Sequence, residues 1–145
     1  MAYMCQTKKK AMAPQIKVVL KKYGMKGSIA VNNHSTLVVN LKEGALDLIG
    51  AANKYNKLMG KIRSWGRYYE ITDNFQVNPY HCEANMSEIG ETKIANFYKE
   101  LLAAMHGVGS RYANHDNSDI MTDYFDVGWY VDINVGQWNN GYKVV

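Results

Sequence analysis

The chain has 145 residues, of which 47% are hydrophobic and 21% are charged, and its formal net charge is +4. This length and apolar content suffice for one hydrophobic core, and they exclude the weakly hydrophobic, highly charged class of disordered chains. We therefore expect one folded domain that spans residues 1–145.

Charge is distributed unevenly along the chain. Residues 1–42 contain eight lysines and no carboxylate, whereas residues 84–145 contain eight carboxylates and four basic residues. The N-terminal part of the chain thus carries a net positive charge and the C-terminal part a net negative charge. If the two ends meet in the fold, their fields partly cancel.

The sequence lacks the marks of a secreted or membrane protein. Cys5 and Cys82 fit no zinc spacing and are expected to be free thiols in a reducing compartment. No stretch approaches the roughly 20 apolar residues of a membrane helix, and the start MAYMCQTKKK lacks the apolar part of a secretory signal. We expect a cytoplasmic protein with no membrane partner.

The first predicted element is an amphipathic helix. Its apolar side is formed by residues at helical spacing: Ile16, Val19, Leu20 and Tyr23. Three lysines occupy the opposite side: Lys17, Lys21 and Lys22. Pro14 fits the first turn of such a helix, and Gly24 fits the left-handed residue that ends it.

A β-hairpin is predicted next. Segments 27–32 and 35–42 flank Asn33 and His34, and Asn tolerates the positive φ that a tight hairpin turn needs. The two arms can form one apolar face from five residues: Ile29, Val31, Leu37, Val39 and Leu41.

Two more helices and a long strand complete the pattern. Helical spacing predicts a helix within 45–59 and a second over 94–105, with Gly107 as its stop. The aromatic stretch between them, 60–85, fits a strand pair or a strand plus a loop. Strict alternation of apolar residues predicts a half-buried strand over 125–135. The predicted class is α+β: an antiparallel sheet, made of the hairpin plus the long C-terminal strand, with about three helices on one face.

The second face of the predicted C-terminal strand is a candidate ligand-binding surface. Tyrosines there can stack on a ligand and carboxylates can accept hydrogen bonds, and the candidates are Tyr124, Asp126, Tyr130 and Asp132. The solvated side of an ordinary antiparallel sheet explains the same pattern.

The basic residues suggest a nucleic-acid-binding surface. Lysines of the first helix can lie along phosphates, and basic residues around a tryptophan suit stacking on an exposed base. The candidates are Lys17, Lys21, Lys22, Lys61, Arg63, Trp65 and Arg67. A solvated lysine face opposite an apolar stripe is the alternative.

The sequence offers no enzyme motif. His115, Asp116, Asp119 and Asp123 could bind a cation, but their spacing matches no calcium or zinc motif and suits a polar turn equally well. If the chain is extended at His81 and Cys82, their side chains point apart, which disfavours a nucleophile and base pair. We expect no catalytic residue, no metal and no cofactor.

Two segments carry a resemblance to a known family. Residues 16–41 read IKVVLKKYGMKGSIAVNNHSTLVVNL, and residues 117–135 contain SDIMTDYF before the final strand. Together they resemble the large-polyvalent-protein-associated domains of tailed phages and conjugative elements, in which a lysine-rich helix leads into a hairpin. The resemblance implies a mobile-element context and brings no catalytic residue. Five residues of the second segment form a family-like patch to which the resemblance assigns no role: Ser118, Asp119, Asp123, Tyr124 and Phe125.

These observations predict a non-enzymatic accessory protein of a phage or mobile element, located in the host cytoplasm. We expect it to counteract host defence by binding a host protein or a nucleic acid. A protein that sequesters a small ligand or nucleotide is the alternative, and a metal-dependent enzyme comes third. An exposed edge of the hairpin or of the final strand could also pair with a second copy of the chain.

Overall fold

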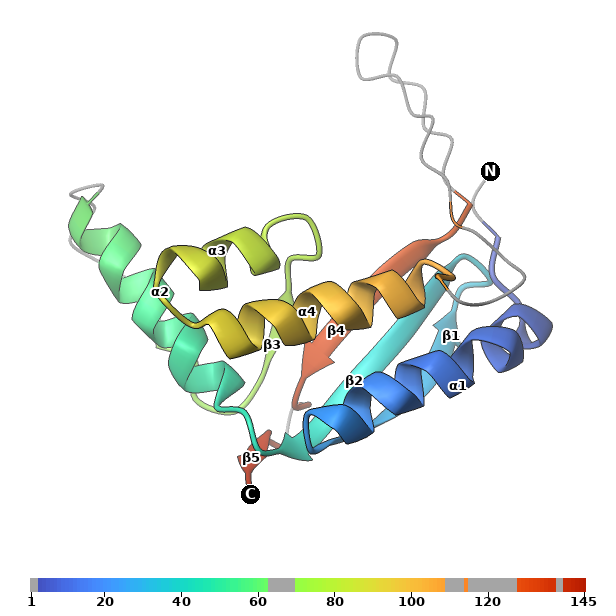
Figure 1. Ribbon diagram of the computed structural model, residues 1–145, viewed down its shortest axis with the longest axis horizontal. Helices are drawn as coiled ribbons and strands as arrows, with labels where there is room; N and C mark the ends of the chain where they lie inside the picture. Colours follow the sequence, from blue (N-terminus) through green and yellow to red (C-terminus); the bar gives the residue numbers. More distant parts are fainter. Residues whose placement is uncertain (1–2, 63–69, 109–113, 115–127, 138–139) are drawn as a thin grey trace, which may run out of the picture.

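The computed structural model describes residues 3–62, 70–108, 114, 128–137 and 140–145 (Figure 1). In this part of the chain it shows an α+β fold with four helices and a five-stranded sheet, which confirms the predicted class. The helices are α1 (Gln6–Lys22), α2 (Leu48–Ile62), α3 (Cys82–Glu88) and α4 (Thr92–Met105). The strands are β1 (Met25–Asn32), β2 (Thr36–Gly44), β3 (Phe75–Val77), β4 (Tyr130–Val135) and β5 (Lys143–Val144).

The sheet is mixed, so the prediction of a wholly antiparallel sheet was wrong. Its strand order is β1-β2-β4-β3, with β5 beside the end of β2. The β1/β2 and β3/β4 pairs are antiparallel, whereas β2 pairs parallel with both β4 and β5. Helices α2, α3 and α4 lie between β2 and β4 in the chain, and such a long connection lets two neighbouring strands run in the same direction.

The hairpin forms as the sequence predicts. Asn33 and His34 adopt φ angles of 53° and 54°, the left-handed conformation that the tight turn requires. Ile29 pairs with Val39, and Val31 pairs with Leu37, so the apolar residues of both arms share one face. That face turns toward the helices and forms part of the core.

Helix α1 is longer than predicted and begins at Gln6, so Pro14 lies inside the helix and not in its first turn. A proline in a helix interior removes one backbone hydrogen bond, at a cost of about 3 kcal/mol. Met4 and Met12, both fully buried, anchor the chain on the N-terminal side of Pro14 and offset that cost. Gly24 follows the helix with φ +68°, as predicted.

The other predicted helices are confirmed. Helix α2 begins where the Asp47 carboxylate accepts a hydrogen bond from the Gly50 N–H group at 2.9 Å. Helix α4 ends before Gly107, whose φ is +89°. The structure also contains α3, a helix of seven residues, in addition to the roughly three helices that the sequence predicts. The sequence did not indicate α3 because so short a helix shows no clear periodicity. Of the aromatic stretch, β3 is described and residues 63–69 lie outside the described chain.

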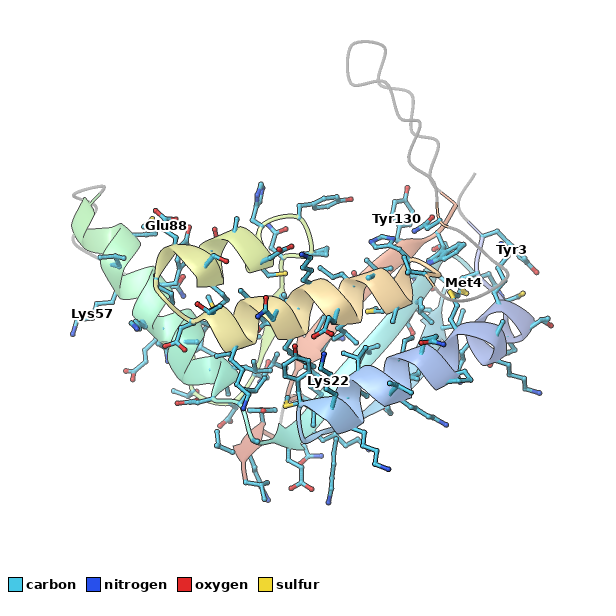
Figure 2. All side chains as sticks on the ribbon, in the orientation of Figure 1. Tyr3, Met4, Lys22, Lys57, Glu88 and Tyr130 are labelled. Carbon is cyan, nitrogen blue, oxygen red and sulfur yellow. The ribbon has the colours of Figure 1, made fainter. Side chains whose placement is uncertain are left out.

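The core lies between one face of the sheet and helices α1 and α4, which cross it side by side (Figure 1). Along β4, Val131, Ile133 and Val135 are buried in this core, which confirms the predicted alternation for the described part of the strand. Tyr130 is 43% exposed (Figure 2), and Asp132 is half-buried on the same side of the strand. The polar side of β4 therefore belongs to the sheet face opposite α1 and α4.

Candidate functional site

A basic groove lies where α1 gives way to β1. Its volume is about 420 Å³, and we define it by its lining residues: Lys17, Leu20, Lys21, Gly24, Met25, Lys26 and Gly27. Gly24, in the left-handed conformation, reverses the chain after the helix, and the buried Met25 then anchors the start of β1. Lys26 is thereby brought to the same groove as Lys17 and Lys21.

The groove is strongly cationic. Within the described residues, neither Lys17 nor Lys21 forms an ion pair or a side-chain hydrogen bond. Lys26 lies 3.5 Å from the Glu43 carboxylate, but both side chains are solvent-exposed enough that such a pair contributes little. The described lining of the groove thus carries three ammonium groups, one of them beside the Glu43 carboxylate, which suits an anionic ligand.

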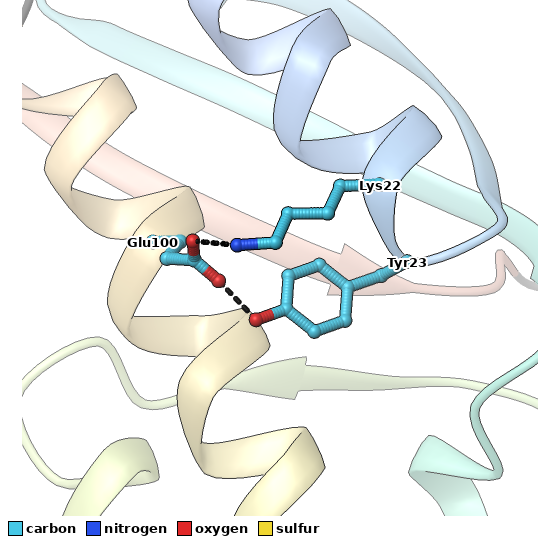
Figure 3. A network of polar contacts seen from close by, with 3 residues as sticks. All are labelled: Lys22, Tyr23 and Glu100. Carbon is cyan, nitrogen blue, oxygen red and sulfur yellow. Dashed lines mark hydrogen bonds and ion pairs between the residues drawn. The ribbon is translucent and has the colours of Figure 1, made fainter.

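Lys22 has a different role from its neighbours in α1. Its ammonium group lies 2.6 Å from Glu100 of α4, and the Tyr23 hydroxyl donates to the other oxygen of the same carboxylate (Figure 3). The Lys22 and Tyr23 contacts lower the pKa of the Glu100 carboxyl, and the hydrogen bond to Glu100 raises the pKa of both Lys22 and Tyr23. The cationic and anionic ends of the chain therefore meet here, and Lys22 joins two helices.

The remaining candidates for nucleic-acid binding lie elsewhere. Lys61 belongs to the last turn of α2, the end of that helix that lies farther from α1 (Figure 1). Arg63, Trp65 and Arg67 lie outside the described residues. The structure therefore brings Lys17 and Lys21 together and adds Lys26, which the sequence pattern did not single out because it lies in a strand.

The polar face of the sheet is the second candidate surface. Tyr130 and Asp132 project from it, next to Thr36 and Val38 of β2 in the strand register. The Asn134 side-chain amide of β4 donates to the Asn40 side chain of β2 at 2.9 Å. Of the predicted ligand-binding residues, Tyr124 and Asp126 lie outside the described chain. The described part of this face offers hydroxyl and amide groups, with the Asp132 carboxylate beside them.

The thiol of Cys82 is poorly suited to nucleophilic chemistry. The premise of an extended chain at His81 and Cys82 was wrong, because these residues begin helix α3. Burial raises the pKa of the Cys82 thiol to about 11, so it stays protonated at neutral pH. Both cysteines are free thiols, as predicted.

The described residues contain no group of three or more metal-ligating side chains that could hold an ion. The predicted cation candidates, which are His115, Asp116, Asp119 and Asp123, lie outside this part of the chain. So does the rest of the family-like patch: Ser118, Tyr124 and Phe125.

Sequence reasoning missed a second cavity, of about 260 Å³, between α2, β3, α3 and α4. Its lining residues are spread from Ala52 to Tyr98, and none of them forms a motif with its neighbours in the chain. The only sequence signal is indirect, in the asparagines and tyrosines that recur through this aromatic region.

Comparison of the chain with family models, curated proteins and solved structures finds no match. Its functional assignment therefore depends on the geometry of these surfaces. Among the described helices, none combines the length and the apolar character needed to cross a bilayer.

Proposed function

We propose that this protein is a non-enzymatic binding module that holds a nucleic acid by its phosphate backbone. The observation that carries the proposal is the basic groove, in which Lys17, Lys21 and Lys26 converge and the first two have no acidic partner in the described structure. Phosphate contacts of this kind supply most of the affinity of sequence-independent binding.

The shape of α1 supports a chain-like ligand. Lys10, Lys17 and Lys21 are exposed and lie at i, i+7 and i+11, which places them along one side of the helix. Eleven helical residues extend over about 16 Å, which corresponds to roughly five phosphates of one strand at about 3.4 Å each. The lysine side of α1 thus continues the basic groove along a track that suits a strand of nucleic acid.

The biological setting of the proposal comes from the resemblance of residues 16–41 and 117–135 to a family of phages and conjugative elements. In that setting, a protein that covers nucleic acid in the host cytoplasm would counteract host defence. Binding to a host protein is the competing version, because the same lysines can meet an acidic protein surface. A second copy of this chain is a further partner to consider.

Fluorescence anisotropy with single- and double-stranded oligonucleotides tests the proposal. We expect binding at 50 mM salt that weakens steeply toward 300 mM, since each phosphate contact releases a counterion, and we expect Lys17→Glu/Lys21→Glu to remove most of it. The matched control is Lys57→Glu/Lys93→Glu, which changes the net charge equally at exposed lysines with no ion pair in the described chain. Lys57 lies on α2, far from Lys22 at the end of α1 (Figure 2).

Absence of binding at low salt, or affinity that does not change with salt, contradicts the proposal. An equal loss of affinity in both double variants shows that net charge alone is responsible, which contradicts a role for the groove. If only a host protein is captured through Lys17 and Lys21, the competing version is correct.

A small-ligand site on the polar sheet face is a second candidate function. The exposed Tyr130 beside the half-buried Asp132 favours it, because the ring offers a stacking surface and the carboxylate offers an acceptor. Both side chains point away from the core, so Tyr130→Ala and Asp132→Ala should abolish ligand uptake while thermal unfolding stays unchanged. Uptake that survives both substitutions eliminates this candidate.

A further inference from the structure

The cavity between α2, β3, α3 and α4 has a distinctive lining, and we refer to it as the amide pocket. Three aromatic residues line it, which are Tyr55, Phe75 and Tyr98. Residues with side-chain amides also belong to the lining: Asn56, Asn78, Asn85 and Gln76. Gln76 pairs with Asn134 in the sheet, so its side chain lies on the polar sheet face and not in the pocket. No lysine, arginine, histidine, aspartate or glutamate is among its lining residues in the described structure.

The wall of the amide pocket is held in place by the fold. The Asn53 side chain accepts a hydrogen bond from the Ile71 N–H group at 2.7 Å and donates to the Ile71 carbonyl at 2.8 Å. This double contact fixes Ile71, a lining residue, against α2. The Asn78 side chain also has a partner within the protein, because its oxygen accepts a hydrogen bond from the Tyr80 N–H group at 3.0 Å. The pocket is therefore largely formed before any ligand arrives.

Two other side-chain amides of the pocket have no partner in the described part of the chain. The side chains of Asn56 and Asn85 make no hydrogen bond within the described residues. Free amides donate and accept at the same time, so they suit a ligand whose edge carries both kinds of group. These two side chains are available for recognition.

The Tyr98 hydroxyl points to the same conclusion. Tyr98 is only 2% exposed, and its hydroxyl has no hydrogen-bond partner in the described structure. Every fully buried side-chain polar atom in the described residues has a partner, so the unpartnered Tyr98 hydroxyl keeps some accessible surface. This fits a group at the wall of the cavity that Tyr98 lines. Burial raises the pKa of Tyr98, and a neutral hydroxyl at that position is a donor that calls for an acceptor.

The chemistry of the ligand follows from this lining. A phosphate or carboxylate would lose its hydration without gaining an opposite charge, so the ligand is neutral. Aromatic walls favour a flat ring system, and asparagine and glutamine amides pair with the donor and acceptor edge of a nucleobase. The volume of about 260 Å³ is below the roughly 300–1,000 Å³ of pockets for drug-sized ligands, which suits a base or a nucleoside.

We propose that the amide pocket binds a neutral nucleobase, with Asn56 and Asn85 at the edge of the base and the Tyr98 hydroxyl as a donor. The base can belong to a free nucleoside or to a nucleotide of a bound strand. This site is separate from the basic groove, and it depends on none of the groove lysines.

Ligand-observed NMR and calorimetry test the proposal on the full chain. The probes are adenosine, guanosine, cytidine and uridine, their 5′-monophosphates, and a short single-stranded oligonucleotide. We expect at least one nucleoside to bind, and its 5′-monophosphate to bind several-fold more weakly because the pocket offers no cation. Tyr98→Phe, which removes only the hydroxyl, should weaken binding by roughly 2- to 10-fold, the range expected for one hydrogen bond.

Asn56→Ala/Asn85→Ala should weaken nucleoside binding by at least about 10-fold, since two hydrogen-bonding groups are lost. Asn96→Ala is the matched control, because Asn96 is an exposed amide of α4 that does not line the pocket. Binding of a nucleoside would show that the pocket accepts the base of a free nucleoside. If only the oligonucleotide binds, and Tyr98→Phe weakens its binding, the pocket accepts a base that belongs to a strand.

Three results overturn the proposal. They are the absence of binding by every probe at millimolar concentration, a 5′-monophosphate that binds more tightly than its nucleoside, and binding that Tyr98→Phe and Asn56→Ala/Asn85→Ala leave unchanged. Lys17→Glu/Lys21→Glu separates the two proposals, because it should remove most of the phosphate-backbone binding and leave nucleoside binding intact.

Discussion

The basic groove and the amide pocket are opposite in both construction and chemistry. Among the described residues, the groove is lined only by residues 17–27 and is cationic, whereas the pocket draws on residues from 52 to 98 and none of these lining residues is charged. Charge acts over several ångströms and tolerates loose geometry, so a helix and the turn after it suffice to build the groove. Recognition by neutral hydrogen bonds needs several groups at short range, and here three helices supply them.

The largest expected effect is a difference in reactivity between the two free thiols, one in the amide pocket and one outside both sites. Cys5, which precedes α1, has a pKa lowered mainly by the backbone N–H of Lys8, and Cys82, which lines the amide pocket, has its pKa raised to about 11. We expect Cys5 to be alkylated by iodoacetamide at pH 7.5 at least about 100-fold faster, because the thiolate reacts. Mass spectrometry of timed samples measures both rates.

Unfolding in urea provides the control, since it should bring the two rates close together. A nucleoside that occupies the amide pocket should slow the alkylation of Cys82 and leave Cys5 unaffected. Equal rates in the folded protein would mean that the pocket does not shield its thiol.

Salt dependence separates the two binding sites next. Lys17→Ala/Lys21→Ala should reduce the slope of log K against log salt by about 1.8 on duplex DNA, at about 0.9 for each lost phosphate contact. Nucleoside binding in the amide pocket should hardly change over the same range of salt. Anisotropy titrations at four salt concentrations measure the slope, and an unchanged slope shows that these lysines do not contact phosphates.

Asn53→Ala should loosen the wall of the amide pocket. It removes both hydrogen bonds to the Ile71 backbone, and the half-buried N–H and carbonyl groups lose their partners. We expect a loss of about 1–3 kcal/mol in the free energy of unfolding, with weaker nucleoside binding and an unaltered basic groove. Urea denaturation measures the loss, and Asn96→Ala, at an exposed site, should change stability by less than about 0.5 kcal/mol.

The smallest expected effect is the acid sensitivity that Glu100 confers. Its pKa is lower in the folded protein than in the unfolded chain, so its contribution is present above the unfolded pKa and is lost as the pH falls through the folded one. Glu100→Gln should therefore flatten the decline in stability between about pH 5 and pH 3. Glu88→Gln, at an exposed helix end without an ion pair in the described chain, should leave that decline unchanged.

Local sequence patterns determined much of this protein. The lysine side of α1, the register of the hairpin, the stop at Gly107 and the alternation along β4 all follow from the spacing of a few adjacent residues. Helical and extended periodicities indicate which side of an element is buried, and they depend only on residues that are close together in the sequence. The start of α1 is the exception, because burial of Met4 and Met12 outweighs the usual effect of Pro14.

Only the tertiary structure decided which of these residues share a site. Lys22 looks like Lys17 and Lys21 on a helical wheel, yet Glu100, 78 residues further along, pairs with Lys22. The parallel pairing of β2 with β4 and the assembly of the amide pocket from α2, β3, α3 and α4 likewise join distant segments. Such contacts depend on how whole elements pack against one another, and the spacing of residues within a single element carries no record of that packing.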